Sequence, residues 1–137
     1  MKNTATNGLF ALLRAALHGK MEDTALFARC DEACWGEIYR RSSVQGVLAV
    51  AWDGLQMLPG ELRPPRALLL EWAFNVEQIE KRYRRHEAAV TRLAAFYHKH
   101  GFPMMLLKGY GLSLSYPVPS HRPFGDIDIW LYGRQPE

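Results

Sequence analysis

The sequence is poor in cysteine, which limits the classes of protein it can belong to. Two cysteines among 137 residues are too few for a disulfide framework, and this excludes a small disulfide-stabilised secreted domain. Cys30 and Cys34 are four residues apart, a spacing that places them on one face of a helix, and we expect them to be reduced thiols. A reducing, cytoplasmic setting is therefore predicted.

Long hydrophobic runs are also missing. No stretch of 18 apolar residues occurs, so we expect no transmembrane helix and no membrane partner. Arg14 interrupts the apolar segment near the N-terminus and no small-residue cleavage site follows, which favours an amphipathic helix over a signal peptide. The hydrophobic share of 48% is typical of a globular chain, and the formal charge of +3 selects no partner.

The first hundred residues carry helical patterns. A first helix is predicted from a cap at Asn7 to Gly19, a second begins at the cap Asp31, and a third covers Val47–Met57. The apolar face predicted for the first helix consists of Leu9, Phe10, Leu13, Ala16 and Leu17.

The longest predicted helix lies between Pro65 and Gly101. Its apolar residues recur at spacings of four and three and form a single seam along the helix. The seam consists of Trp72, Val76, Ile79, Tyr83, His86, Val90, Leu93 and Tyr97. Such a seam has to pack on the preceding helices or on another chain. A homo-oligomer formed through Trp72–Tyr97 is therefore possible.

Two polar features of this helix allow a functional and a structural interpretation. We interpret His86 as a hydrogen-bonded histidine of the core or of an interface. The basic run Lys81–Glu87 could contact a nucleic-acid backbone, but a solvated helix face that pairs with neighbouring glutamates is the more common use of such a run.

The pattern changes from helix to strand after Gly101. The segment 102–108 is a short apolar run that suits a buried strand, a glycine-flanked turn and a short helix follow, and 126–132 alternates as a strand does. We predict an α+β protein in which a mainly helical region, 1–102, precedes the first strand–helix–strand of a larger core, 103–137.

Two aspartates interrupt the last strand. Asp126 and Asp128 alternate with isoleucines, so they share one face of a strand while the isoleucines face a core. Two carboxylates this close repel each other unless a cation lies between them. Hard oxygen ligands suit Mg²⁺ or Mn²⁺, which makes both aspartates candidate metal ligands.

The turn after the first strand could hold the phosphates of a nucleotide. Gly109 and Gly111 flank a turn between strand and helix, where backbone N–H groups can face an anion. Lys108 and Arg122 could add cationic contacts to phosphate.

The stretch "LLKGYGLSLSYPVPSHRPFGDIDIWL", 106–131, resembles the nucleotidyltransferase superfamily of the polymerase-beta type. More narrowly, it is similar to a bacterial family of uncharacterised nucleotidyltransferase-like proteins that carry a helical region before this motif. The resemblance implies transfer of a nucleoside monophosphate from a nucleoside triphosphate to an unidentified acceptor, with Mg²⁺ or Mn²⁺ held by Asp126 and Asp128. Lys108, Gly109, Gly111 and Arg122 would then be nucleotide contacts.

The sequence departs from the superfamily pattern at two points. Tyr110 follows Gly109 where serine or glycine is common, so a serine contact to phosphate is missing. The superfamily also carries a third carboxylate on a later strand, and no later strand follows before Glu137. We therefore expect a truncated or partial nucleotidyltransferase, with weak or absent turnover from this chain alone.

Two other interpretations remain. The chain could be a non-catalytic helical interaction or dimerisation module with a vestigial nucleotide-binding tail. Alternatively, Asp126 and Asp128 could be ordinary solvent-facing residues paired with Arg122 or a lysine.

Overall fold

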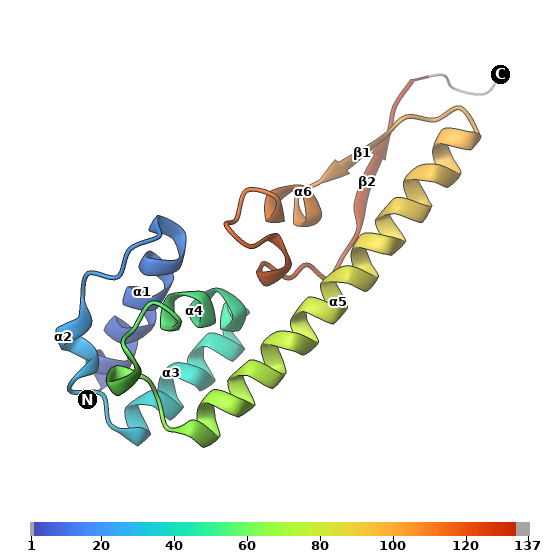
Figure 1. Cartoon of the computed structure of the whole chain (residues 1–137). Coiled ribbons are helices and arrows are strands. Elements are labelled where there is room, and N and C mark those ends of the chain that lie inside the picture. The colour runs from blue at the N-terminus through green and yellow to red at the C-terminus, as the bar shows by residue number, and fades with distance from the viewer. Residues whose placement is uncertain (1, 134–137) are drawn as a thin grey trace. The chain divides into compact units, whose positions relative to one another are not determined.

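The computed structural model describes residues 2–133, with the side chain of Lys2 left out. The chain forms two compact units, Met1–Gln78 and Ile79–Glu137, and the helix α5, Arg66–Lys99, belongs in part to each (Figure 1). The structure is mostly helical with one small sheet, which confirms the predicted α+β class. The functional division predicted between residues 102 and 103 stays a prediction.

The N-terminal unit is a group of helices. Its elements are α1 (Lys2–His18), α2 (Thr24–Phe27), α3 (Glu32–Val44), α4 (Leu48–Leu55), the 3-10 turn η1 (Gly60–Leu62) and the first part of α5. Helix α1 packs against both α3 and α4. At the α1–α4 contact the helices approach so closely that a Cβ atom added at Gly54 would lie 2.0 Å from the carbonyl oxygen of Leu12. Only glycine fits there.

The predicted start of α1 is wrong, and its predicted apolar face is confirmed in part, because Leu9 and Ala16 are buried. The helix already runs through Asn7, which lies inside it and caps nothing, although Gly19, with φ +74°, does end it. Phe10 and Leu17 are 53% and 50% exposed, so they do not belong to the buried face. That buried face includes Ala5, Leu9, Ala11, Leu12, Ala15 and Ala16. Four of these six residues are alanines, which suits the close packing of α1 on α4.

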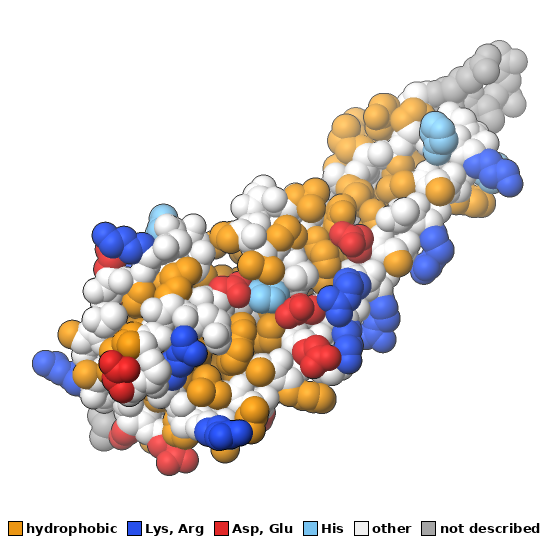
Figure 2. Space-filling view, viewed as in Figure 1, with side chains coloured by type: hydrophobic (Ala, Val, Ile, Leu, Met, Phe, Trp, Pro, Cys, Tyr) orange, Lys and Arg blue, Asp and Glu red, His pale blue; other side chains and the backbone are white. Residues whose placement is uncertain are grey.

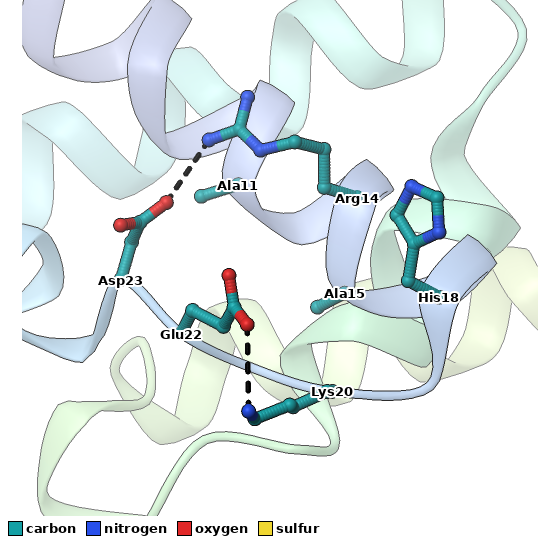
Figure 3. A pocket seen from close by; sticks show the side chains of 7 residues that line it. All are labelled: Ala11, Arg14, Ala15, His18, Lys20, Glu22 and Asp23. Carbon is teal, nitrogen blue, oxygen red and sulfur yellow. Dashed lines mark hydrogen bonds and ion pairs between the residues drawn. The ribbon is translucent and has the colours of Figure 1, made fainter.

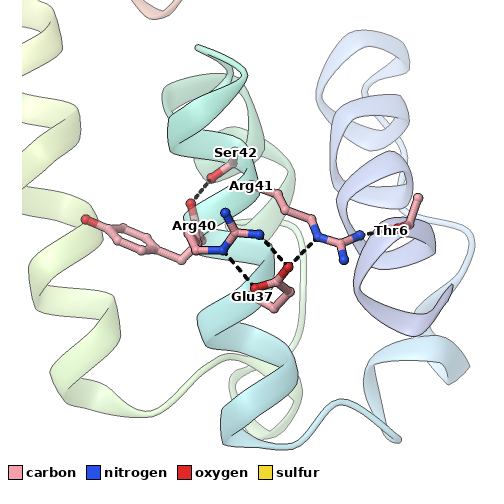
Figure 4. Close-up of polar contacts among 6 residues, drawn as sticks. Thr6, Glu37, Arg40, Arg41 and Ser42 are labelled. Carbon is pink, nitrogen blue, oxygen red and sulfur yellow. Dashed lines mark hydrogen bonds and ion pairs between the residues drawn. The ribbon is translucent and has the colours of Figure 1, made fainter. Parts of the chain in front are cut away.

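Helix α3 starts as predicted. The Asp31 carboxylate accepts a hydrogen bond from the Cys34 N–H at 2.8 Å, which confirms Asp31 as the cap. Further along the helix, Glu37 accepts hydrogen bonds from the guanidinium groups of Arg40 and Arg41, and Arg41 also donates to the Thr6 hydroxyl of α1 (Figure 4). These contacts, those to Arg40 first, lower the pKa of the Glu37 carboxyl from 4.5 to about 2.

The cysteines are not the free thiols that the sequence suggested. Cys30 and Cys34 are joined in a disulfide, with their Cα atoms 5.3 Å apart. Cys30 precedes α3 while Cys34 lies in its first turn, so the bridge closes the loop before the helix. The predicted cytoplasmic location relied in part on reduced thiols and loses that support. Within residues 2–133 we find no helix that is both long and apolar enough to cross a membrane.

The C-terminal unit places a two-stranded antiparallel sheet beside the second part of α5 (Figure 1). Its elements are β1 (Met104–Leu107), α6 (Gly109–Ser113), the 3-10 turn η2 (Pro119–His121) and β2 (Asp128–Leu131). The strands pair Met105 with Trp130 and Leu107 with Asp128. The predicted order of strand, short helix and strand is confirmed.

A small aromatic core holds the loop after α6 against α5. Tyr83 and Val90 of α5 form a buried cluster with Phe124, and Leu106 and Ile127 pack against it. His86 lies beside this cluster with Nδ1 2.7 Å from the Phe124 carbonyl oxygen, which confirms that it is a hydrogen-bonded core histidine. The loop that leads into β2 is therefore fixed by contacts from α5.

The apolar seam of α5 is used inside the chain. Trp72 is fully buried in the N-terminal unit, where its indole N–H donates to the Leu48 carbonyl at 3.0 Å. Tyr83 and Val90 are buried in the C-terminal unit. The homo-oligomer predicted through Trp72–Tyr97 stays a prediction, but the seam no longer requires one.

Candidate nucleotide site

An ion pair joins the end of β1 to the start of β2. The Lys108 ammonium lies 3.2 Å from Oδ2 of Asp128, and both side chains are substantially exposed. Asp128 is paired with Leu107, the residue just before the lysine, so the register of the two strands places both charged groups at the same end of the sheet. The structure thus brings together one predicted metal ligand and one predicted phosphate contact.

The glycine turn lies against the segment that precedes β2. A Cβ atom added at Gly109 would lie 3.4 Å from Cβ of Phe124 and 3.5 Å from the carbonyl oxygen of Asp126. Gly109 has φ +45°, and Lys108 before it has φ +43°. A positive φ is strained for lysine and is found mainly where the surrounding structure enforces it, often at functional sites.

The alternating pattern had placed Asp126 and Asp128 in one strand, and this is wrong. β2 begins at Asp128, so Asp126 belongs to the extended segment before it. Asp126 is exposed and Asp128 is half-buried. The strand starts late because the chain at Phe124 is held by α5 and reaches β1 only at Leu107, where pairing begins.

The two other predicted phosphate contacts have different surroundings. The N–H of Gly111 donates to the Lys108 carbonyl at 3.0 Å, so it closes the turn and does not face an anion. The Arg122 guanidinium donates to the carbonyl of Pro123 at 3.1 Å and is half-buried. Both groups therefore have a partner within the chain.

The sequence interpretation missed the residues that position this turn. Tyr110 donates a hydrogen bond to Glu87 of α5 at 3.0 Å, and Tyr83 and Ser113 are joined through their hydroxyls at 2.8 Å. Burial raises the pKa of the Tyr110 hydroxyl, and the hydrogen bond to Glu87 adds to the rise. Tyrosine therefore follows Gly109 because its hydroxyl ties α6 to α5. Its spacing from Glu87 along the chain gave no signal of this contact.

Carboxylate oxygens from Asp126 and Asp128 are the donor set that Mg²⁺ or Mn²⁺ prefers. Magnesium commonly takes one or two protein carboxylates and completes its shell with water and substrate phosphates. The side chains described in the structure form no group of three or more histidine, cysteine or acidic residues that could hold a metal. Asp126 and Asp128 therefore remain a pair of candidate ligands.

Two pockets lie elsewhere in the chain, and neither contains the predicted nucleotide contacts. A pocket of about 210 Å³ beside α1 contains Arg14, Lys20 and His18, but Asp23 and Glu22 neutralise its cations through ion pairs at 3.0 and 3.5 Å (Figure 3). A second pocket of about 410 Å³ is lined by Thr6, Leu9, Phe10, Leu13, Arg41, Gln45 and Val47. Neither pocket is lined by a predicted site residue.

The basic run of α5 behaves as the structural interpretation predicts. Lysine and arginine side chains gather on an exposed face of the helix (Figure 2). Arg84 pairs with Glu80 at 3.9 Å, whereas Glu87 is engaged by Tyr110. An exposed, partly paired face of this kind selects no partner.

A lysine and a glycine turn that follow β1 therefore lie beside the acidic start of β2. The model of a family described as "Uncharacterised nucleotidyltransferase" matches residues 31–135, and the chain belongs to this family. Membership supports a general nucleotidyltransferase role and implies a nucleoside triphosphate as substrate. Comparison with curated proteins and with solved structures finds no match.

Proposed function

We propose that this chain carries the metal- and phosphate-binding part of a nucleotidyltransferase that moves a nucleoside monophosphate from a nucleoside triphosphate to an acceptor hydroxyl. The observation that carries the proposal is the ion pair of Lys108 with Asp128 beside the Gly109 turn. A cationic phosphate contact and a carboxylate metal ligand are then adjacent, as a metal–triphosphate complex requires.

Each residue of the site has a distinct role in this proposal. Asp126 and Asp128 would hold Mg²⁺ or Mn²⁺ through their carboxylates, and Lys108 would contact the phosphates. Gly109 allows the turn to pack directly against Phe124 and Asp126, so that Lys108 stays close to the acidic segment. Arg122 supplies a second cationic contact from the loop before β2.

The reaction forms a bond between the acceptor oxygen and the α-phosphorus and breaks the bond from that phosphorus to the bridging oxygen. Pyrophosphate leaves with the electron pair of the broken bond, and the acceptor hydroxyl gives its proton to solvent water. When bound, the metal would stabilise the charge that develops on the phosphoryl oxygens and would lower the pKa of the hydroxyl. Lys108 would exchange its carboxylate partner for phosphate and neutralise the leaving pyrophosphate.

The ion pair is also compatible with the simpler interpretation, in which an exposed aspartate has a lysine partner. Exposed pairs of this kind contribute little stability, so the pair by itself does not explain a strained backbone at Lys108. Membership of the family and the position of the Gly109 turn favour nucleotide binding.

Calorimetric titration with Mg²⁺·ATP tests the proposal. The wild-type chain should bind only when Mg²⁺ is present, and Asp126→Asn or Asp128→Asn should weaken binding by at least about tenfold because a metal ligand is lost. Glu61→Gln removes one exposed negative charge from the N-terminal unit and should leave binding unchanged. Equal affinities of the wild type and both aspartate variants would refute the proposed site.

A further inference from the structure

The sheet of the C-terminal unit has one face towards α5 and one face open. Residues opposite each other in antiparallel strands lie on the same face, so Met105 shares a face with Trp130, and Leu107 shares one with Asp128. Alternation along each strand makes this a single face, which we call the open sheet face. Leu106 lies on the other face, against the aromatic core of Tyr83 and Phe124.

Large apolar side chains are exposed on the open sheet face. Trp130 is 58% exposed, Met105 is 43% exposed, and Leu107 is exposed beside Asp128. The tryptophans Trp35 and Trp72, in contrast, are buried in the N-terminal unit. A contiguous apolar surface next to charged residues is a common property of ligand-binding sites.

We propose that Trp130 is the stacking platform for the base of the nucleotide, an inference that rests on the proposed function. Asp128 and Trp130 are two residues apart on one strand and point to the same side, with Cα atoms about 6.5–7 Å apart. A ribose separates the base of a nucleotide from its α-phosphate. A nucleotide held by its phosphates at Asp128 can therefore lay its base on the exposed indole ring.

The neighbours of Trp130 determine what kind of recognition this face supplies. Met105 lies directly across the strand pair from Trp130, and thioethers contact aromatic rings favourably. Met105 and Leu107 offer no hydrogen bonds to the edge of a base, so the face supplies stacking. All four nucleotides should bind, and purines, which have the larger ring surface, should bind a few-fold more tightly than pyrimidines.

Binding of a triphosphate with and without a base tests the inference. Calorimetry should show that the wild type binds Mg²⁺·ATP on the order of tenfold more tightly than Mg²⁺·tripolyphosphate, because a stacked base adds about this much. Trp130→Leu should abolish the difference and leave tripolyphosphate binding unchanged. Trp130→Phe, which keeps an aromatic ring, should retain most of it. Circular dichroism confirms that each variant is folded.

A matched control tests whether any exposed aromatic ring would have the effect expected of Trp130, or only a ring at this position. Phe74→Leu removes another aromatic side chain, 60% exposed on α5 in the N-terminal unit, and should leave ATP binding unchanged. Tryptophan fluorescence gives a second measurement. The emission of Trp130 is the difference between the wild type and Trp130→Phe. Saturation with Mg²⁺·ATP should quench this emission, whereas tripolyphosphate should not.

Three results would overturn the inference. If Trp130→Leu binds ATP as tightly as the wild type while Asp128→Asn does not, the base lies elsewhere and the proposed function still holds. If acrylamide fails to quench Trp130 in the free protein, another part of the molecule covers the ring and no base can stack on it. If neither ATP nor tripolyphosphate binds the wild type, the inference and the proposed function are both wrong.

Discussion

The Lys108 ammonium lies 3.2 Å from Oδ2 of Asp128, and the lysine holds this position with a backbone φ of +43°. Such a conformation costs about 1–3 kcal/mol for a residue other than glycine, more than an exposed ion pair returns. Strain that is not repaid by stability is expected where a side chain is held ready for a ligand.

The strain at Lys108 predicts opposite effects on stability and binding. Lys108→Gly relieves the backbone and should raise the free energy of unfolding by about 1 kcal/mol, while weakening Mg²⁺·ATP binding. Lys108→Ala keeps the strain and loses only an exposed ion pair, so its free energy of unfolding should fall by less than about 1 kcal/mol. Urea denaturation and calorimetry measure the two effects. A glycine variant that is less stable than the alanine variant would contradict this account of the turn.

The close contact of α1 with α4 predicts a large effect of one methyl group. Gly54→Ala would place a Cβ atom 2.0 Å from the Leu12 carbonyl oxygen, so the helices must separate, at a cost of about 1–3 kcal/mol or more. Gly36→Ala in α3 meets no atom within 4 Å and should stabilise the chain by about 0.5–1 kcal/mol through helix propensity. Thermal denaturation of both variants measures the contrast, and similar melting temperatures would refute the contact.

The arginine pair around Glu37 predicts how stability depends on pH in acid. The pKa of Glu37 is about 2 in the folded chain and near 4.5 without its partners, so its contribution is complete above about pH 4.5. The contribution is lost as pH falls from 4.5 towards 2, because the unfolded chain then binds the proton more readily. Glu37→Gln should flatten the stability profile over this window, as followed by urea denaturation. An unchanged slope would show that the arginines do not hold the carboxylate.

The sequence predicted those elements whose pattern depends on local burial. The seam around Trp72 and Tyr83 predicted α5, and Asp31 predicted the start of α3. The apolar run 102–108 and the alternating run 126–132 predicted both strands. The apolar face of α1 was predicted only in part, because the close approach of Gly54 to Leu12 depends on tertiary packing and Phe10 stays exposed.

The candidate site could be predicted only in outline. The residue types of Asp128 and Lys108 indicated the chemistry, but their ion pair depends on the strand register, which the sequence pattern left open. Tyr110 reaches Glu87 from 23 positions away, and Cys30 bonds to Cys34 across the start of a helix. The Tyr110–Glu87 contact depends on the tertiary arrangement, which local periodicity does not encode. The disulfide was missed because Cys30 lies before the helix that was expected to carry both cysteines.

Nuclear magnetic resonance with paramagnetic Mn²⁺·ATP tests the central claim most directly, because it locates the bound nucleotide. In isotope-labelled protein, the amide signals of Lys108, Gly109 and Asp128 should broaden at low Mn²⁺·ATP concentration, before those of Trp35 and Ile38 in the N-terminal unit. Asp128→Asn should remove the selective broadening. Broadening that begins in the N-terminal unit, or that is unchanged in the variant, would contradict a nucleotide site between β1 and β2.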